Sequence, residues 1–320
     1  MPVCVPDWNP HAPLQRLAFP WLAPAGVELA ALRLDLLDPL LSGNKWFKLR
    51  PHLEAAAARG AEGLISLGGA HSNHLHALAA AGQRFAFPTV GLLRGEPQDT
   101  PTVRDVQAFG MRLHWLGYGG YRERHQADFW LPWQGRYPGF ALVPEGGFGL
   151  PAARACAAIV EQARQQMAAL GWDDYHGWWL AGGTGTTAAG LVLAESGARP
   201  VHVASAVPAS HGVSSQLNAL LQAAGHADGG YRLHEASRGG FGRVDAELAR
   251  FMAECERSQA LPLDPLYTGK ALLALRYTVE AGYFAAGTRL VFLHSGGLQG
   301  CRAMAAHLQV LAADEPTRTM

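Results

Sequence analysis

Residues 177–190 read GWWLAGGTGTTAAG, and their pattern indicates a parallel α/β fold. A run of apolar residues typical of a buried strand leads into a loop of glycine and threonine, and a helix-forming sequence follows. Strand, loop and helix in this order form the repeating unit of parallel sheets. Glycines let a ligand approach the backbone, and the free N–H groups that open a helix attract anions. Thr184, Gly185, Thr186 and Thr187 are therefore candidate phosphate ligands, although a plain tight turn would share the pattern.

The same alternation of strand and helix patterns continues along the chain. Further strands are predicted at 26–36, 63–69, 88–93, 111–116, 200–206 and 289–294, and helices at 46–59, 72–81, 102–110, 151–170 and 186–196. Strands that alternate with helices of this length indicate βαβ units. Segments 117–140 and 223–243 are rich in glycine, aromatic and polar residues, and we expect loops near a site there.

The composition is that of a globular protein with no strong charge. Of the 320 residues 49% are apolar and 16% charged, and the formal net charge is zero. A nucleic-acid or anionic-membrane partner would favour a basic excess, so neither is expected. No apolar run is long enough for a membrane span, and the first residues lack a signal-peptide pattern. Four dispersed cysteines predict neither a disulfide framework nor a zinc site, which favours a cytoplasmic location.

Residues 42–50, SGNKWFKLR, contain two lysines, Lys45 and Lys48. A lysine that acts as a nucleophile must be held in place and must lose its proton easily. The preceding SGN turn would set Lys45 at the start of a helix, where the positive end of the helix favours the neutral amine. Lys45 is therefore a candidate nucleophile. The alternative is that both lysines are solvent-facing helix charges.

Residues 67–82, LGGAHSNHLHALAAAG, predict a strand that ends in glycines before a helix. Ser72 and Asn73 are good N-cap residues, and the helix start is a natural seat for a carboxylate or phosphate. A second possibility is a metal site formed by the histidines His71, His74 and His76. That spacing does not put three imidazoles on one helical face, and no acidic residue completes the set, so no metal is expected. The simplest alternative is a capped helix with surface histidines.

Two late segments carry further candidates. In PLDPLYTGKA, residues 262–271, Tyr267 could be an acid, a base or a contact to a ring. In LVFLHSGG, residues 290–297, Ser295 follows a predicted strand and could bond a ring nitrogen. A single tyrosine in a loop is also common for structural reasons alone.

In this order along the chain, the segments resemble the family of 1-aminocyclopropane-1-carboxylate (ACC) deaminases and D-cysteine desulfhydrases. These enzymes use pyridoxal 5′-phosphate (PLP) and belong to the tryptophan-synthase-β-like class, fold type II. The resemblance runs from Ser42 to Gly297. It implies PLP as cofactor, a homodimer, and two α/β domains of open twisted parallel sheets with helices on both faces. The large domain would comprise residues 1–46 and 163–320, and the small domain, residues 47–162, would close over the active site.

The resemblance implies a role for each candidate residue. Lys45 would hold the cofactor as a Schiff base and move the Cα proton of the substrate. Asn73 would bond the ring hydroxyl, and the helix start from Ser72 to His74 would grip the substrate carboxylate, with His74 in place of the usual Gln. Tyr267 would face the active site. The other implied cofactor contacts are Asn44, Lys48, Thr184, Gly185, Thr186, Thr187 and Ser295.

Two positions bear on the reaction. ACC deaminases resemble one another in having Glu and Leu where this chain has Thr268 and Ser295, whereas the desulfhydrases carry small hydroxyl residues there. A carboxylate beside the pyridine nitrogen strengthens the ring as an electron sink, which opening a cyclopropane requires. Hydroxyl groups are better matched to β-elimination. The aligned loops also put Phe241 where a second tyrosine is usual, and Phe148 in a loop that is usually polar, so a more apolar pocket is expected.

The predicted activity is PLP-dependent deamination of a small amino acid by β-elimination, with D-cysteine giving pyruvate, ammonia and sulfide. Lys45, Ser72 and Tyr267 would be catalytic, and Phe241 would join the substrate contacts. ACC deamination is the nearest alternative, followed by another PLP lyase or racemase that acts on a β-substituted amino acid. A protein that binds PLP or an amino acid without catalysis is the alternative of a different class.

Overall fold

The computed structural model describes residues 2–4, 7–226 and 229–313. One group of strands is β1 (Leu14–Leu17), β2 (Glu28–Arg33), β7 (Gly177–Gly182), β8 (Val201–Ser205), β9 (Tyr231–Glu235) and β10 (Arg289–His294). The other is β3 (Gly63–Gly68), β4 (Thr89–Leu93), β5 (Arg112–Trp115) and β6 (Phe140–Leu142).

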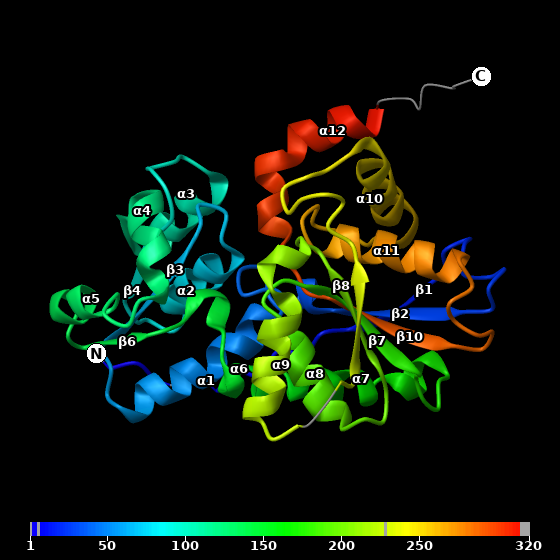
Figure 1. The fold of residues 1–320 in the computed structure, drawn as a ribbon, viewed down its shortest axis with the longest axis horizontal. Coiled ribbons are helices and arrows are strands. Elements are labelled where there is room, and N and C mark those ends of the chain that lie inside the picture. The colour runs from blue at the N-terminus through cyan, green and yellow to red at the C-terminus, as the bar shows by residue number, and fades with distance from the viewer. Residues whose placement is uncertain (1, 5–6, 227–228, 314–320) are drawn as a thin grey trace.

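These strands form two sheets that lie side by side (Figure 1). The six-stranded sheet has the order β1-β2-β10-β7-β8-β9, and the four-stranded sheet has the order β5-β4-β3-β6. Neighbouring strands in both sheets run parallel except β1, which is antiparallel to β2. The predicted α/β class with parallel sheets is therefore confirmed.

Helices connect the strands. Those around the four-stranded sheet are α1 (Lys45–Ala58), α2 (Asn73–Arg84), α3 (Pro101–Ala108), α4 (Gly117–Arg122) and α5 (Leu131–Arg136). Those around the six-stranded sheet are α6 (Leu150–Ala155), α7 (Ala157–Arg164), α8 (Thr186–Glu195), α9 (Val213–Ala223), α10 (Ala246–Gln259) and α11 (Thr268–Glu280), and α12 (Ala305–Ala313) packs on α10. In the part of the chain that the structure describes, no helix has the length and apolar character of a membrane span.

The six-stranded sheet is covered on both faces. Successive residues of a strand point to opposite sides, so Leu32 and Trp178 join one buried cluster, with α6 to α9, while Ala31 and Trp179 join another, with α10 and α11. Burial on both sides explains why these strands read as continuous apolar runs rather than as an alternating pattern.

Three expectations about local structure are wrong. The helix predicted over 151–170 is divided into α6, α7 and a 3₁₀ turn, with a break at Cys156, whose N–H bonds Ala153 in a tighter i−3 pattern. The predicted loop at 117–140 contains the short helices α4 and α5. The predicted loop at 223–243 contains β9, an edge strand whose backbone pairs with β8 while its side chains stay partly or fully exposed.

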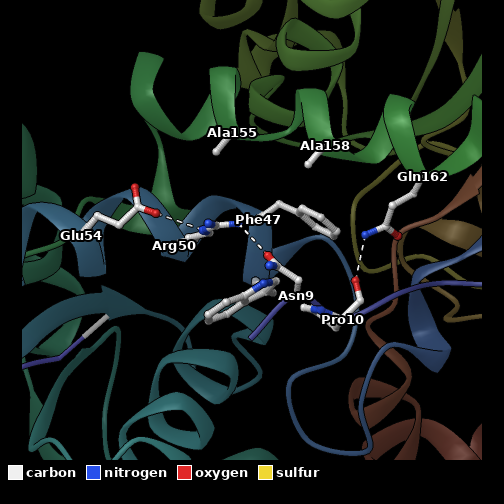
Figure 2. A pocket seen from close by; sticks show the side chains of 9 residues that line it. Asn9, Pro10, Phe47, Arg50, Glu54, Ala155, Ala158 and Gln162 are labelled. Carbon is white, nitrogen blue, oxygen red and sulfur yellow. Dashed lines mark hydrogen bonds and ion pairs between the residues drawn. The ribbon is translucent and has the colours of Figure 1, made fainter. Parts of the chain in front are cut away.

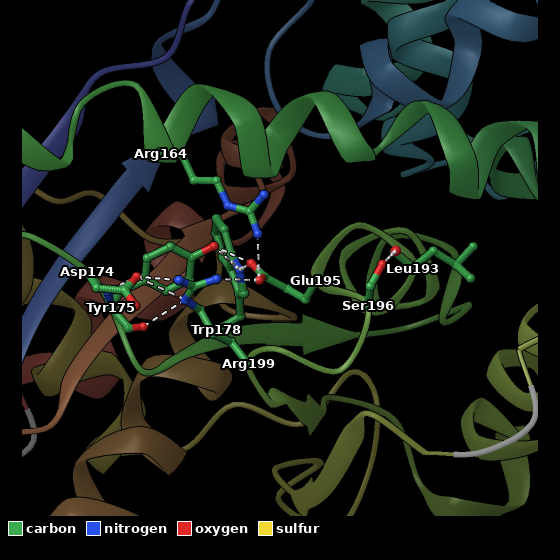
Figure 3. A network of polar contacts seen from close by, with 8 residues as sticks. All are labelled: Arg164, Asp174, Tyr175, Trp178, Leu193, Glu195, Ser196 and Arg199. Carbon is green, nitrogen blue, oxygen red and sulfur yellow. Dashed lines mark hydrogen bonds and ion pairs between the residues drawn. The ribbon is translucent and has the colours of Figure 1, made fainter.

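Glu195, the last residue of α8, anchors a buried polar network at the end of this helix (Figure 3). Its carboxylate is fully buried, and it accepts hydrogen bonds from Tyr175, from Trp178 Nε1 at 2.7 Å, and from two arginines. Arg164 donates at 2.8 Å and Arg199 at 3.1 Å. The network joins α7, α8 and the segment before β7, because each of them supplies a partner.

We predict that Glu195→Ala lowers the free energy of unfolding by about 3–5 kcal/mol, because removing one partner of a buried ion pair leaves the others desolvated and unpaired. Urea denaturation followed by circular dichroism measures the change. The matched control is Glu54→Ala, which breaks the exposed Arg50–Glu54 pair and should cost less than about 1 kcal/mol. Equal losses in the two variants would contradict the structural role of Glu195.

Candidate active site

The predicted site residues gather at the carboxyl ends of parallel strands. Ser72 follows β3, Thr184 follows β7 and Ser295 follows β10, while Lys45 opens α1. Open α/β sheets bind their ligands at this edge, where strand ends leave loops and helix starts free. The backbone N–H of Asn44 donates to Ser295 O at 3.1 Å, which brings the start of α1 against the end of β10.

Lys45 is half-buried and lies next to the threonine loop. Its Nζ donates to Asn44 Oδ1 at 2.6 Å, and Asn44 Nδ2 donates to Thr187 Oγ1 at 2.9 Å. Burial lowers the pKa of Lys45 to about 8, although the nearby carboxylate of Asp264 and the Cys156 thiol act in the opposite direction. A sizeable fraction of this amine is therefore neutral near physiological pH, which a nucleophile requires.

Lys48 lies one helical turn further along α1 and is 3% exposed. Its Nζ is 3.5 Å from Thr184 Oγ1, a long hydrogen bond. Burial, together with repulsion from Lys45, lowers the pKa of Lys48 to about 7. Among the described residues neither ammonium forms an ion pair with a carboxylate. A half-buried and a buried ammonium without an ion-paired carboxylate favour an anionic ligand between them and the loop.

The loop before α8 has the features of an anion site. Gly185 has a φ of +70° and caps α8, so the N–H groups of the first helical turn are left unbonded within the helix. Thr184 Oγ1 lies 3.1 Å from Thr186 Oγ1. A Cβ on Gly146 would lie 4.0 Å from Lys48 Nζ, so the Gly146 turn covers this lysine from the other side. Hydroxyls, helix N–H groups and an ammonium together suit a phosphate.

Ser72 and Asn73 occupy the start of α2 as predicted. Ser72 Oγ accepts from the N–H of Leu75 at 3.1 Å, so this hydroxyl serves as the N-cap. Asn73 Oδ1 accepts from Gln299 Nε2 at 2.9 Å, and its Nδ2 lies 2.9 Å from where a Cβ on Gly297 would stand. Asn73 is thus held against the loop that follows β10.

The His74 ring is hydrogen-bonded inside the protein, to Ser66 on β3. The Ser66 hydroxyl donates to Val143 O at 2.8 Å, so His74 Nε2, at 2.8 Å from Ser66 Oγ, must carry the proton and donate to it. Its buried Nδ1 has no partner among the described residues. Burial and the nearby lysines keep the pKa of His74 well below its usual value, so the ring is neutral and has no N–H left for a carboxylate.

Tyr267 lies at the start of α11, and a Cβ on Gly183 would be 3.1 Å from its ring. Burial and the nearby carboxylates of Asp264 and Glu145 raise the pKa of Tyr267, so its hydroxyl stays protonated. Thr268 is fully buried. Its hydroxyl donates to Asp264 Oδ2 at 2.6 Å and accepts from Asp264 N at 2.8 Å, so both of its hydrogen-bonding roles are taken. Ser295, rather than Thr268, is therefore the candidate hydroxyl for a contact with a ring nitrogen.

Phe241 packs against Tyr267, with ring centroids 5.4 Å apart. The loop that carries Phe241 is bound by Lys270, a buried residue that the sequence reasoning did not select. The sequence did contain a signal for Lys270, because lysine is rare in this chain. Of the 26 lysines and arginines, only Lys45, Lys48 and Lys270 are lysines. Surface positive charge in this protein is supplied by arginine.

The opposite side of α1 borders a cavity of about 240 Å³ (Figure 2). It is lined by Asn9, Pro10, Trp46, Phe47, Arg50, Glu54, Ala155, Ala158 and Gln162, and none of these is a predicted site residue. Arg50 is already bonded to Glu54 and Asn9. Over the described ranges, no group of three or more His, Cys, Asp or Glu side chains is placed to hold a metal ion.

No family model matches the chain, but several curated proteins do. It is 27% identical to the 1-aminocyclopropane-1-carboxylate deaminase of Ralstonia pickettii, over 92% of this chain and 93% of the relative. It is 28% identical to the "bifunctional D-cysteine desulfhydrase/1-aminocyclopropane-1-carboxylate deaminase, mitochondrial" of Arabidopsis thaliana, over 90% and 76%.

Among solved structures, a crystal structure described as an ACC deaminase homologue matches with a TM-score of 0.81 and 22% identity, covering 97% of this chain and 96% of that one. A fungal L-serine ammonia-lyase from Rhizomucor miehei has a TM-score of 0.65 and 14% identity, covering 94% and 96%. The fold and these relatives define an enzyme of the tryptophan-synthase-β-like class, fold type II. Within that class the chain is related to the family of ACC deaminases and D-cysteine desulfhydrases, which confirms the resemblance.

We predict that, in protein without cofactor, the reactivity of Lys45 toward acetic anhydride reaches half its maximum near pH 8. The neutral amine is the reactive form, so reactivity rises as pH rises through the pKa of the folded protein. Pulse labelling and peptide mass spectrometry follow this residue. The same measurement in urea is the control, since an unfolded lysine titrates near ~10.4. A midpoint above about 10 in the folded protein would refute the lowered pKa.

Proposed function

We propose that this enzyme binds PLP through Lys45 and Lys48 and deaminates a small amino acid by β-elimination. One observation carries the proposal. Lys45, which is half-buried, and Lys48, which is buried, lie one helical turn apart beside the glycine and threonine loop at the start of α8, and neither is ion-paired with a carboxylate of the described residues. This arrangement suits a cofactor that has one phosphate and one aldehyde, since an ammonium and helix N–H groups bind the first and a neutral amine bonds to the second.

The proposed cofactor contacts follow from the donors present. Lys48 and the Thr184–Thr187 loop would hold the phosphate, and Lys45 would hold the cofactor covalently. Asn73 and Ser295 would contact the ring from the start of α2 and the end of β10. When bound, PLP supplies an electron sink for a negative charge at the substrate Cα.

The residues of the chain handle the proton and the orientation. Because the pKa of Lys45 is about 8, its neutral amine is suited to accept the Cα proton of the substrate, and the ammonium so formed can give up a proton again. Because His74 has no free N–H, the substrate carboxylate would be bound by the backbone N–H groups at the start of α2 instead. Tyr267, whose hydroxyl stays protonated because its pKa is raised, would donate a hydrogen bond to the leaving group.

The proposed reaction is elimination of the β-substituent, with D-cysteine as the model substrate and pyruvate, ammonia and sulfide as products. This chain has Thr268 where ACC deaminases have Glu, and Ser295 where they have Leu, so neither position supplies a carboxylic acid to the ring, which supports elimination over cyclopropane opening. ACC deamination remains the second candidate, because the Ralstonia relative carries that name. The domain limits of 1–46 with 163–320 and 47–162, the homodimer and the cytoplasmic location stay predictions.

A panel of D- and L-amino acids with β-leaving groups, together with ACC, tests the proposal. We expect the wild type with PLP to release pyruvate from at least one β-substituted amino acid. Lys45→Ala should lose both this activity and the visible absorbance of the covalently held cofactor. α-Ketobutyrate from ACC alone would favour the second candidate. No keto acid from any compound, despite bound PLP, would favour a binding protein and refute the enzyme.

Lys48→Met tests the phosphate contact separately. Loss of a charge-assisted hydrogen bond should raise the Kd for PLP by about 10–100-fold. The Kd for pyridoxal, which lacks the phosphate, should change little. Fluorescence titration with both compounds measures the two constants, and Arg50→Met, on the other side of α1, is the matched control. An equal loss for both compounds would contradict a phosphate role for Lys48.

A further inference from the structure

The ammonium of Lys270 binds a loop of main chain rather than an acid. Lys270 lies in the first turn of α11 and is 1% exposed. Its three N–H donors bind the carbonyl oxygens of Ser237, Gly240 and Phe241, at 2.9, 2.8 and 2.9 Å. An ammonium has three donors, so all of them are used. Within the described residues it forms no ion pair.

The loop over 237–241 depends on this cation for its shape. Arg238 and Gly239 both have positive φ, +54° and +78°, and the chain there turns three carbonyl dipoles toward one point. Without a cation these dipoles would repel one another. The loop has a second, independent attachment, because Arg238 donates to Asp245 at 2.6 Å and to Glu247 at 2.8 Å. Losing the ammonium would therefore loosen the turn without detaching it.

The start of α11 also positions the Tyr267 ring, against which Phe241 of the 237–241 loop packs. Tyr267 precedes Lys270 by three residues, and the Asp264 carboxylate fixes this start of α11 by accepting from the N–H of Tyr267 at 2.7 Å. Phe241, at the end of the bound loop, meets the Tyr267 ring at 60°. Tyr267 in turn lies against Gly183, next to the threonine loop. A chain of direct contacts thus leads from the Lys270 ammonium to the candidate active site.

We infer that Lys270 is a positioning residue that sets the Phe241–Tyr267 wall and thereby selects substrates by the size of their β-substituent. The inference rests on the proposed function, because it assigns this wall to the same active site. The wall offers two aromatic rings and one hydroxyl, so it suits an uncharged, apolar β-substituent such as a thioether. A looser wall would admit larger substituents and bind small ones less well.

The experiment compares Lys270→Met, Phe241→Ala and the double variant with the wild type, all as PLP-loaded protein. The substrates are cysteine and its S-methyl and S-benzyl derivatives, in the enantiomer that the wild type accepts. The ratio of kcat/KM between the benzyl and methyl compounds is the readout. The matched control is Arg276→Met, which changes an exposed charge on the same helix.

We expect Lys270→Met to shift this ratio by about tenfold, comparable to the selectivity that one methylene carries in an apolar pocket, mostly through KM. Arg276→Met should leave the ratio unchanged. Because Lys270 acts through Phe241, its effect should vanish in the Phe241→Ala background. An unchanged ratio in folded Lys270→Met, or an equal shift in both backgrounds, would overturn the inference.

Two measurements keep the test decisive. If Lys270→Met does not fold, Phe241→Ala decides alone, and an unchanged ratio in that variant overturns the inference. If the wild type releases no keto acid at all, the proposed function fails. Hydrogen exchange of the 237–241 amides then tests the loop itself: faster exchange in Lys270→Met than in Arg276→Met supports the role of Lys270, and equal exchange refutes it.

Discussion

Lys45, half-buried, and Lys48, buried, share one face of α1, where their ammonium groups repel each other and are not ion-paired with any acid of the described residues. Desolvating a cation without a partner is unfavourable, so these groups lower the stability of the folded protein. The cost falls when the amines become neutral or when an anion arrives. The surrounding structure supplies the rest of an anion site through Thr184, the α8 start and the Gly146 turn. On the proposed function, these groups would bind the phosphate of the cofactor.

Much of the fold could be predicted because its strands are buried on both faces. The runs that became β3, β7 and β10 are continuous and apolar, which distinguishes them clearly from their neighbours. The edge strand β9 could not be found in this way, since all of its residues are exposed or half-exposed and its pairing with β8 is a tertiary property. The break at Cys156 likewise has no sequence signal of the glycine or proline kind.

The candidate site divides in a similar manner. The positions of Lys45, Ser72 and the threonine loop could be predicted, because each lies at a helix start with a recognisable sequence pattern. The position of the proton on the His74 ring could not be predicted, because it is determined by Ser66, which lies on β3 and itself donates to Val143 O. The satisfaction of Thr268 by Asp264 also requires the geometry of the folded loop. Lys270 is an intermediate case, since the scarcity of lysine in the sequence was visible without any structure.

Helix α8 connects two features that are far apart in function. Its first residues form the proposed phosphate site. Its last residue, Glu195, lies about 15 Å further along the helix and accepts hydrogen bonds from Arg164 and Arg199. The two arginines lie at the C-terminal end of α8, where the helix dipole is negative. An anion at the N-terminal end and guanidinium groups at the C-terminal end would both interact favourably with this dipole. On the proposed function, phosphate binding at the start of α8 and the arginine contacts at its end would each stabilise the same helix.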